Sequence, residues 1–418
     1  MVTLIQTPRQ ETAPATIAQK PAPSGRAALR RAALIVLKPL FLAAGALLYG
    51  AMRIVEPWRK VRVGMLSYER LGHLAIHSEI FLRKRVAGTG LDTTTILVSG
   101  PAANTQLLDM IAREVPVLRS RWALHLYFQG LRPFVEGTRF HEPLPCSGWD
   151  YHVLAASGPQ MKFRPDEDAR GRQALRAMGL PPEAQFVCVH SRDKAYLDQA
   201  HPYFTREQWA YHDYRDCDIA NYLPAARALS AKGLYALRMG SIIEKQLGDG
   251  DPRIVDYATR FRSDFLDIWL PANCKFFLGC TAGLVNVPLL FNVPVAAANY
   301  VPLGFASFRA GDIFIPKTYR DARGVELPFR RIVENGAWEW TDGRQFAQAN
   351  IEVVENSTED ISALADEMDA RLDGRWKPEP GDEKLQLRFR ELFPKDHPMR
   401  HFPSRVGAAF LRRHEGLL

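Results

Sequence analysis

The chain has 418 residues, 47% of them hydrophobic and 24% charged, which is the composition of a globular protein with enough apolar material for two or three domains. Its net charge of +8 resides in residues 1–62, which hold ten basic and two acidic residues, because the remaining 44 basic and 44 acidic residues balance. This distribution excludes a broad nucleic-acid surface on the folded body and indicates a local contact between the N-terminal arm and an anionic partner.

The N-terminal arm has two parts. Residues 1–25 are rich in Ala, Pro, Thr and Gln, have no apolar period and are predicted to be disordered. The segment 32–52, AALIVLKPLFLAAGALLYGAM, is an apolar run long enough to span a bilayer. A cleaved signal peptide is not expected, because the run starts late and no clean cleavage site follows it.

Three interpretations of the apolar run compete: an interfacial helix, a spanning helix and a buried core helix. Lys38 and Pro39 interrupt the run, and basic residues on both flanks give no inside–outside bias. These features favour an interfacial helix that is held by apolar burial and by anionic lipid. We therefore expect the protein at the cytoplasmic face of the inner membrane.

Strand and helix patterns alternate from residue 61 onwards. The pattern predicts strands and helices in the order strand 61–65, helix 73–84, strand 93–99, helix 104–114, strand 186–190, helix 219–232, strands 234–238 and 253–256, helix 264–273, strand 275–279, helix 284–290, strand 294–298 and helix 361–372. Such alternation is typical of parallel sheets. The fold class is therefore α/β with two Rossmann-like domains, at 61–180 and 181–418, preceded by an arm at 1–60.

Two predicted strands end in basic residues. The segment VCVHSRDKAYL ends a buried strand in His190, Ser191, Arg192, Asp193 and Lys194, and the segment LRMGS ends another in Arg238. In open parallel sheets, ligands bind outside the carboxyl ends of the strands, where arginine can pair with a phosphate and lysine adds a point charge. The alternatives are a salt bridge within the first loop and a tight turn at the second.

The segment YHDYRDCDIANY, at 211–222, concentrates His, Asp, Arg and Tyr ahead of a helix that Asp218 is placed to cap. The alternative is a capping loop with solvated charges. Asp216-Cys217-Asp218 has the DxD spacing of metal-dependent sugar transferases, but two further matches elsewhere in the chain show how unspecific this spacing is. We assign no metal. The five cysteines include no CxxC pair, which argues against a zinc site or a disulfide framework and favours a reducing compartment.

The segment 263–300 is the most informative, because helix, strand, small-residue loop, helix and strand follow one another. The loop 279–283, GCTAG, lets a ligand approach the backbone, and the next helix is expected to direct free N–H groups at a diphosphate. Thr281 adds a hydroxyl donor. The alternative is an ordinary βαβ turn.

These stretches resemble a family of bacterial glycosyltransferases and, more distantly, GT-B enzymes with a fucosyltransferase-like donor domain. The resemblance rests on VCVHSRDKAYL, YHDYRDCDIANYLPAARALSAKG, LRMG and SDFLDIWLPANCKFFLGCTAGLVN, over about 187–300, with a weaker match at ERLGHLA. It does not cover the region before 61 or the tail after about 320. HSRDK stands where the fucosyltransferases carry two consecutive arginines, so the resemblance does not identify the sugar nucleotide.

The resemblance implies a nucleotide-sugar donor bound by the second domain, with Arg192 on its diphosphate and with Thr281 and Gly283 contacting phosphate. His190, Lys194 and Arg238 complete the predicted donor site. The resemblance implies neither a metal nor another cofactor. Arg192, Arg238 and helix N–H groups would stabilise the charge of the leaving group.

An inverting reaction needs a base for the acceptor hydroxyl. The candidates in the first domain are Glu69, His73 and His77, and we predict His73, beside Gly72.

The expected function is transfer of a sugar to a glycan or lipid-linked acceptor in the synthesis of a surface polysaccharide. One alternative is another nucleotide-sugar enzyme, such as an epimerase or a phosphorylase-like enzyme. No GxGxxG follows the first strand, which disfavours a dinucleotide-dependent epimerase. The other alternative is a non-catalytic membrane-bound scaffold that keeps the fold without binding a donor.

Overall fold

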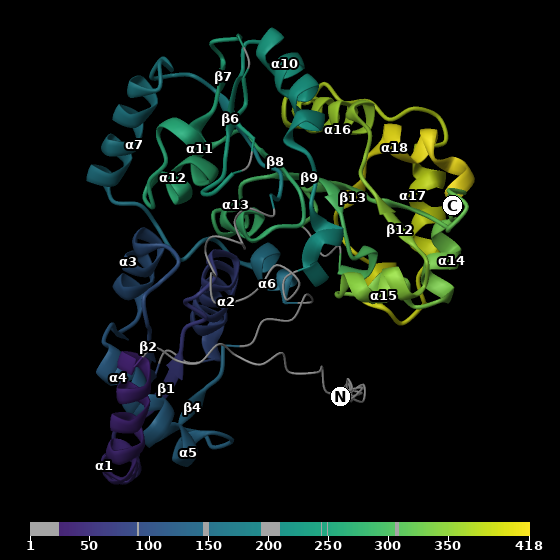
Figure 1. Cartoon of the computed structure of the whole chain (residues 1–418). Coiled ribbons are helices and arrows are strands. Elements are labelled where there is room, and N and C mark those ends of the chain that lie inside the picture. The colour runs from purple at the N-terminus through teal and green to yellow at the C-terminus, as the bar shows by residue number, and fades with distance from the viewer. Residues whose placement is uncertain are drawn as a thin grey trace.

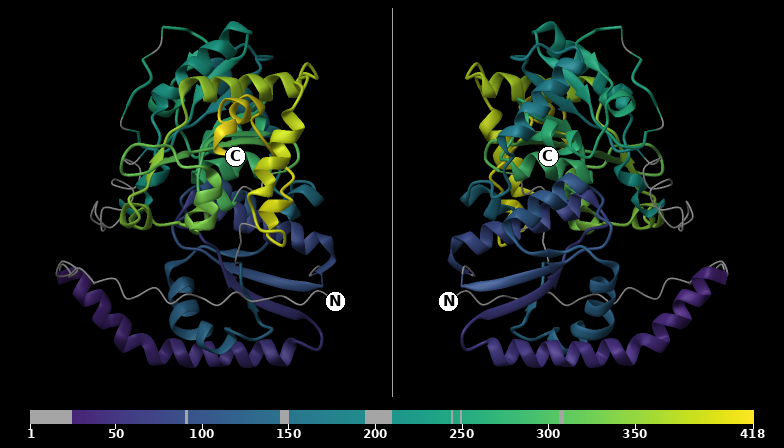
Figure 2. Two further views of the ribbon diagram at one scale, coloured as in Figure 1. Left: turned by 90° about the vertical axis from the view of Figure 1, so that its right-hand side faces the viewer. Right: turned by 90° about the vertical axis from the view of Figure 1, so that its left-hand side faces the viewer.

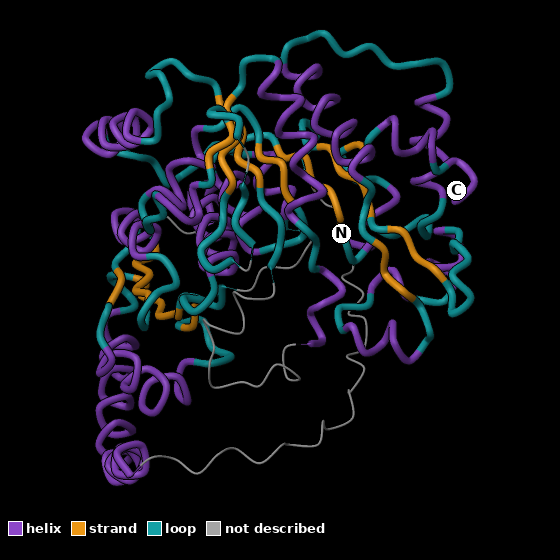
Figure 3. Tube along the Cα trace, turned by 45° about the horizontal axis from the view of Figure 1, so that its top comes forward, coloured by secondary structure: helices purple, strands orange, loops and turns teal. Residues whose placement is uncertain are grey.

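Two parallel β-sheets form the framework of the molecule, which confirms the predicted α/β class with two Rossmann-like domains (Figure 1). The structure is a computed structural model and describes residues 25–89, 92–144, 150–193, 210–243, 245–248, 250–305 and 309–418. Figure 3 shows the strands in three groups, of which the two larger are these sheets and the third is a separate strand pair.

The first domain is built on a four-stranded sheet in the order β3-β2-β1-β4, with every pair parallel. Its strands are β1 (Lys60–Met65), β2 (Thr93–Val98), β3 (Val117–Leu118) and β4 (His141–Glu142). Its helices, after α1 (Gly25–Val55), are α2 (Leu71–Lys84), α3 (Thr105–Glu114), α4 (Arg121–His125), α5 (Arg132–Val135) and α6 (Tyr151–Ala156). Asn104 caps α3 by accepting a hydrogen bond from the backbone N–H of Leu107.

The second domain is built on a seven-stranded sheet in the order β13-β10-β9-β8-β5-β6-β7, again with every pair parallel. Its strands are β5 (Phe186–Val189), β6 (Tyr235–Arg238), β7 (Ile254–Val255), β8 (Phe277–Gly279), β9 (Val295–Tyr300), β10 (Ile313–Pro316) and β13 (Arg405–Val406). Strand β5, FVCV, is buried throughout, as expected of a sheet covered on both faces.

Most helices of the second domain surround this sheet, and a small antiparallel pair of strands, β11 (Thr318–Arg320) and β12 (Glu352–Val354), lies beside it. The helices are α7 (Pro165–Ala177), α10 (Leu223–Ala231), α11 (Tyr257–Arg260), α12 (Leu266–Asn273), α13 (Asn286–Leu290), α14 (Phe329–Glu334), α15 (Gly343–Gln348), α16 (Thr358–Leu372), α17 (Asp382–Glu391) and α18 (Ala408–Arg413). Gly233 adopts a φ of 91° just after α10 and ends that helix, as predicted. The tail is an integral part of the domain, because β13 extends the sheet at its edge.

Alternate residues of β2 face two different cores. Leu97 belongs to a large core that runs through α2 and α3 into the second domain. Val98 points to the opposite face, into a small core with Met52 of α1 and with Tyr127 and Phe140. The first sheet is therefore covered on one face by helices continuous with the second domain, and on the other by α1 and the segment 126–135.

Arg83 of α2 ties the two domains together from within the core. Its side chain is fully buried, and its Nε donates to Glu79 Oε1 at 2.7 Å. Its Nη2 donates to the carbonyl oxygen of Leu290 at 2.6 Å, at the end of α13, and both Nη atoms contact Asn292 Oδ1. Its Nη1 donates to two further carbonyl oxygens, of Leu154 and Ser157. One guanidinium thus satisfies acceptors from three segments of the chain.

The first turn of α2 touches the second domain through a contact between two glycines. A Cβ atom on Gly72 would lie 2.6 Å from the Cα of Gly283, a separation that real Cβ atoms essentially never show. The side-chain amide of Asn286 donates to the carbonyl oxygen of Gly72 at 3.3 Å. A second contact joins α3 to the loop before α12, where Thr105 N–H and Oγ1 both bond to Asp264 Oδ2. With Gly72 against Gly283 at its start and Arg83 bonded to Leu290 near its end, helix α2 is fixed against the second domain at both ends.

The buried Arg83 is expected to contribute far more to stability than an exposed arginine of the same kind. Arg83→Met should lower the free energy of unfolding by about 3–5 kcal/mol, because it leaves the Glu79 carboxylate buried without its partner. The matched control is Arg132→Met, which breaks an exposed arginine–glutamate pair with the same spacing and should cost less than about 1 kcal/mol. Urea unfolding measures both, and equal losses would contradict the role given to Arg83.

Candidate functional site

Polar residues that follow the carboxyl ends of three strands gather on the side of the second sheet that meets the first domain. His190 and Arg192 follow β5, Thr281 follows β8, and Lys317 follows β10. The strands are parallel, so these positions share one edge of the sheet, where ligands of such folds bind. Arg70, at the start of α2, comes from the first domain and acts electrostatically on residues of this edge.

Arg192 is held in place by the backbone and by a carboxylate. Its N–H donates to Cys280 Sγ at 3.1 Å, its guanidinium pairs with Asp216, and its Nη1 donates to the carbonyl oxygen of His212 at 3.3 Å. Only 10% of its side chain is exposed. Burial, followed by the charge of Arg215, lowers the pKa of Arg192 to about 10, so it remains charged at neutral pH. The site therefore has a fixed cation at the position that the sequence predicts.

Arg215, from the 3-10 helix Ala210–Arg215, has no carboxylate partner among the residues that the structure describes. Its Nε is buried without a hydrogen-bond partner, and its guanidinium lies 5.7 Å from the centre of the Tyr214 ring. Burial lowers the pKa of Arg215, and so does the charge of Arg70. A half-buried charge without a counter-ion destabilises the fold, which is the arrangement expected where a bound anion supplies the missing charge.

The positive charges of these arginines also lower the pKa values of neighbouring histidines. The pKa of His212 is lowered to about 3 by burial and by Arg215, Arg192 and Arg70. The pKa of His73 is lowered by partial removal from water and by Arg70 and Arg215. Arginines from both domains thus act on histidines from both domains. The result is one interdomain cluster, which we call the cationic cluster and define as Arg70, Arg192, Arg215 and Lys317.

His73, the predicted base, is the first of two neighbouring histidines on α2. Its side chain is exposed, and its ring centre is 5.1 Å from that of His77, one helical turn later. His77 Nδ1 lies 3.0 Å from the hydroxyl of Ser67, and burial followed by the charge of His73 lowers the pKa of His77 to about 4. Both imidazoles are therefore neutral at pH 7, the state in which histidine accepts a proton. Glu69 is exposed on the preceding loop.

Sequence reasoning did not assign Lys317, Arg215 or Arg70 to the site. Lys317 is buried and donates from Nζ to the carbonyl oxygen of Asp216 at 2.6 Å, and burial lowers its pKa. The signal that identified Arg192 also applies to Lys317, because it directly follows the buried strand IFIP. Arg215 lies in the segment that the sequence singled out. Arg70 had no signal of its own.

The remaining predicted residues differ in how open they are to a ligand. Arg238 is 2% exposed and pairs with Asp256, with 3.3 Å between Nη1 and Oδ1. Its side chain is therefore buried within the domain and is not open to a ligand. His190 is buried beside it, with an unbonded Nδ1 and a pKa lowered to about 3 by burial and then by Arg238. Lys194 lies outside the described residues.

The small-residue loop is less open than the sequence suggests. Thr281 Oγ1 accepts the N–H of Val301 at 3.0 Å, and Gly283 is covered by Gly72. The predicted helix 284–290 is a 3-10 turn, Gly283–Val285, followed by the five-residue α13. The first turn of the predicted helix is therefore a 3-10 turn, and Gly72 of α2 lies against it at Gly283. Phosphate contacts from Thr281 and Gly283 remain a prediction.

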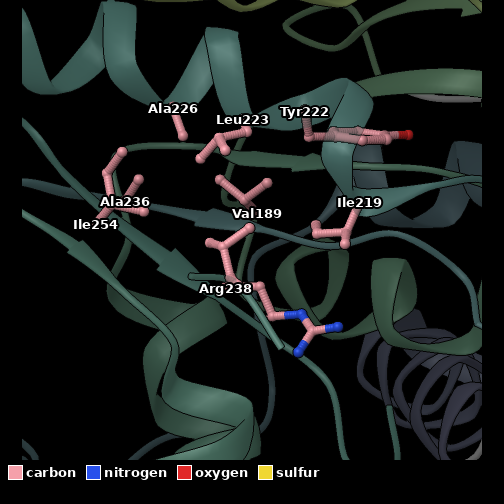
Figure 4. A pocket seen from close by; sticks show the side chains of 9 residues that line it. Val189, Ile219, Tyr222, Leu223, Ala226, Ala236, Arg238 and Ile254 are labelled. Carbon is pink, nitrogen blue, oxygen red and sulfur yellow. The ribbon is translucent and has the colours of Figure 1, made fainter. Parts of the chain in front are cut away.

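A small cavity lies in the second domain and a larger one in the first domain. The first, between β5, β6 and α10, has a volume of about 10 Å³, no more than one water molecule needs. Figure 4 shows apolar side chains around it and the Arg238 guanidinium pointing away from them. The second, of about 300 Å³, lies in the first domain and is lined by Arg62, His77, Ile80, Phe81, Lys84, Arg85, Thr93, Thr95, Glu142, Pro143 and Leu144. Only the second is large enough for a sugar-sized ligand.

Comparison with known families gives little further guidance. No family model matches the chain, and no curated protein matches it. Among solved structures, the chain is similar to a glycosyl transferase of family 9 from Veillonella parvula DSM 2008, with 12% identity and a TM-score of 0.39 over 62% of this chain and 86% of that one. It is similar to the E. coli ADP-heptose LPS heptosyltransferase II, with 12% identity and a TM-score of 0.36 over 57% and 84%.

A third similar structure is the dodecameric iron-containing heptosyltransferase TibC in complex with ADP-D-β-D-heptose, with 11% identity and a TM-score of 0.28 over 57% of this chain and 58% of that one. Similarity this low does not establish the reaction of this chain. Its function is therefore argued from its own residues.

Removal of Arg215 and removal of Arg192 should change the stability of the ligand-free protein in opposite directions. Arg215→Met should raise the free energy of unfolding by about 1 kcal/mol, because it removes a half-buried charge that has no counter-ion among the described residues. Arg192→Met should lower the free energy of unfolding by about 3 kcal/mol, because it leaves the Asp216 carboxylate without its positively charged partner. Urea unfolding without added anions measures both. A larger loss for Arg215→Met than for Arg192→Met would show that Arg215 is a structural residue.

Proposed function

We propose that this chain is a glycosyltransferase that binds the diphosphate of a nucleotide-sugar in the cationic cluster and transfers the sugar to an acceptor held by the first domain. The observation that carries the proposal is Arg215, a half-buried arginine whose Nε is buried without a hydrogen-bond partner, which has no carboxylate partner in the described part of the chain and lies among three further cations. A diphosphate has the charge and the oxygen atoms that such a cluster needs, because guanidinium groups pair with phosphate in two-pronged contacts.

The same cluster suits the reaction. When the bond between the sugar and the diphosphate breaks, negative charge develops on the leaving phosphate oxygen. Arg192 is fixed in position before the substrate arrives, so it stabilises this charge without reorganising, and Arg215 adds a second positive charge beside it. His73 is neutral and exposed, and Arg70 and Arg215 lie close enough to affect its titration. It is thus placed to take the proton from an acceptor hydroxyl as that oxygen attacks the sugar carbon.

The cavity of the first domain supports a sugar acceptor. It has a mixed lining, with the ring of Phe81 and with the paired charges of Arg62 and Glu142, whose atoms are 3.1 Å apart. Paired charges offer both donors and acceptors to sugar hydroxyls, and an aromatic ring offers a surface for a sugar face. His77 lines this cavity one helical turn from His73, so an acceptor in it would lie near the base. We propose a glycan or lipid-linked acceptor, in the synthesis of a surface polysaccharide.

A non-catalytic scaffold accounts less well for the cluster. A scaffold that bound no anion would gain stability by losing Arg215, since the charge is half-buried and repelled by Arg70 and Arg192. A ligand-binding site is the usual reason for keeping such a group. The glycosyltransferase proposal therefore explains a feature that the scaffold leaves unexplained.

The proposal is tested by a panel of nucleotide-sugars, which includes ADP-D-β-D-heptose, the ligand of one similar structure. We expect one nucleoside diphosphate and its sugar conjugate to raise the melting temperature, because they bind only the folded state. The enzyme should then release the diphosphate when a membrane lipid extract supplies the acceptor. Arg215→Met should lose both effects, while Arg323→Met, which removes an exposed arginine, should keep them. A panel without a single shift on a folded protein would favour the scaffold.

His73 should matter for turnover and not for donor binding. His73→Asn should lower kcat by about 100-fold or more, the usual contribution of a positioned base, with an unchanged Kd for the nucleoside diphosphate. In the wild type, kcat should fall as the pH drops through the pKa of His73, which lies below the ordinary 6.5, because only the neutral imidazole accepts a proton. The pH–rate profile of both proteins checks this. An acid limb that persists in His73→Asn would assign the base elsewhere.

A further inference from the structure

Helix α1 has two apolar stripes on opposite sides. The inner stripe packs on the first domain: Gly45 lies against the backbone of Gly130, Tyr49 lies between the rings of Phe134 and Phe140, and Met52 enters the small core. The outer stripe recurs at intervals of three or four residues and consists of Val36, Leu40, Ala43, Leu47, Ala51 and Ile54, with Trp58 in the turn just after the helix, all exposed. Leu47 is 76% and Trp58 82% exposed.

The outer stripe has no cover among the described elements. Both views of Figure 2 show α1 along the end of the first domain that is remote from the second domain, with its outer side facing away from the molecule. Trp122 of α4, whose ring centre is 6.4 Å from that of Phe41, adds a 65% exposed aromatic next to the helix. Soluble proteins rarely leave such a continuous apolar row in water, so it indicates a contact surface.

The inner stripe decides how α1 meets a membrane. In length and composition, the segment Val36–Val55 is sufficient to cross a bilayer, and it is the one such helix in the part of the chain that the structure describes. A spanning helix, however, is surrounded by lipid. Here the side from Phe41 to Met52 is occupied by the segment 126–135, where Gly130 would clash with Phe41 if it carried a Cβ atom. Crossing would also draw Arg132 and Glu136 into the hydrocarbon or undo the small core.

The basic residues around α1 also fit an anionic partner. The surplus of basic residues in 1–62 equals the net charge of the whole chain, and Arg53, Arg59 and Lys60 lie at the end of α1 that carries Trp58. An apolar stripe with an interfacial tryptophan and adjacent basic residues matches a leaflet whose lipid headgroups are anionic. A second copy of this chain would match the stripe but not the excess of positive charge.

We propose that α1 lies flat in one leaflet of an anionic bilayer, with the outer stripe in the acyl region and the inner stripe kept on the protein. The protein thus binds the membrane as a monotopic protein, and both ends of the chain stay on the same side of the membrane. The cationic cluster, on the opposite side of the first domain from α1, then remains in water. This inference does not depend on the proposed function, since it rests on α1 alone.

The test is flotation of the full-length protein with phosphatidylcholine vesicles that contain or lack phosphatidylglycerol. We expect the wild type to float with the anionic vesicles and several-fold less with the neutral ones. The double variant Leu40→Glu/Leu47→Glu should bind at least about tenfold more weakly. Leu387→Glu, which places one negative charge on an exposed leucine of α17, should bind like the wild type. Circular dichroism of the variants confirms that the fold is kept, since both replaced leucines of α1 are exposed.

Three results would overturn the proposal. The first is unchanged flotation of the double variant. The second is a dimer in sedimentation velocity that the double variant dissociates while its flotation is unaffected, which would assign the stripe to a second copy. The third comes from inverted membrane vesicles of cells that express the protein with tags at both ends. Protease should remove both tags, and protection of the N-terminal tag alone would show a spanning helix.

Discussion

The fixed position of α2 is the constraint on which the site depends. Gly72 and Gly283 touch backbone to backbone, and Arg83 binds the end of α13 from the core. Between these anchors, α2 carries His73 and His77, and Arg70 precedes it. The first-domain half of the site is therefore set in place by the second domain as much as by its own sheet. A side chain at Gly72 or Gly283 would move the base relative to the cations without touching either.

This arrangement explains why the site is electrostatically unbalanced. The cations reach one place from separate segments: Arg192 after β5, Arg215 from a 3-10 turn, Lys317 after β10 and Arg70 from the other domain. Asp216 pairs with Arg192, but no described carboxylate pairs with Arg215, and the surrounding histidines are kept neutral. Burying like charges together costs stability, so the fold bears this cost where the ligand supplies the compensating charge. The distant α1 adds a second unbalanced surface, apolar and flanked by positive charge, on the far side of the first domain.

The sequence predicts much of the fold, because alternating buried strands and helices leave a clear pattern and Gly233 marks a helix end that the structure confirms. It also predicts where Arg192 lies, since a residue that follows a buried strand lies at the carboxyl edge of a parallel sheet. It could not show that Asp256 draws Arg238 into the fold, or that Gly72 covers Gly283. Nor could it predict that Arg70 lies close to Arg215, because that proximity depends on how the two domains pack, which no local pattern encodes. The role of the predicted site residues stays a prediction.

The central claim is that the cationic cluster recognises a diphosphate, and one titration tests it most directly. Isothermal titration calorimetry of the full-length protein would compare the nucleoside diphosphate that gives the largest thermal shift with the matching nucleoside. The account predicts saturable binding of one diphosphate per chain, and binding of the nucleoside weaker by about 100-fold or more, since charge-assisted contacts to phosphate supply most of the affinity. Equal affinities for the two, or binding of the diphosphate that is unchanged in Arg215→Met, would contradict it.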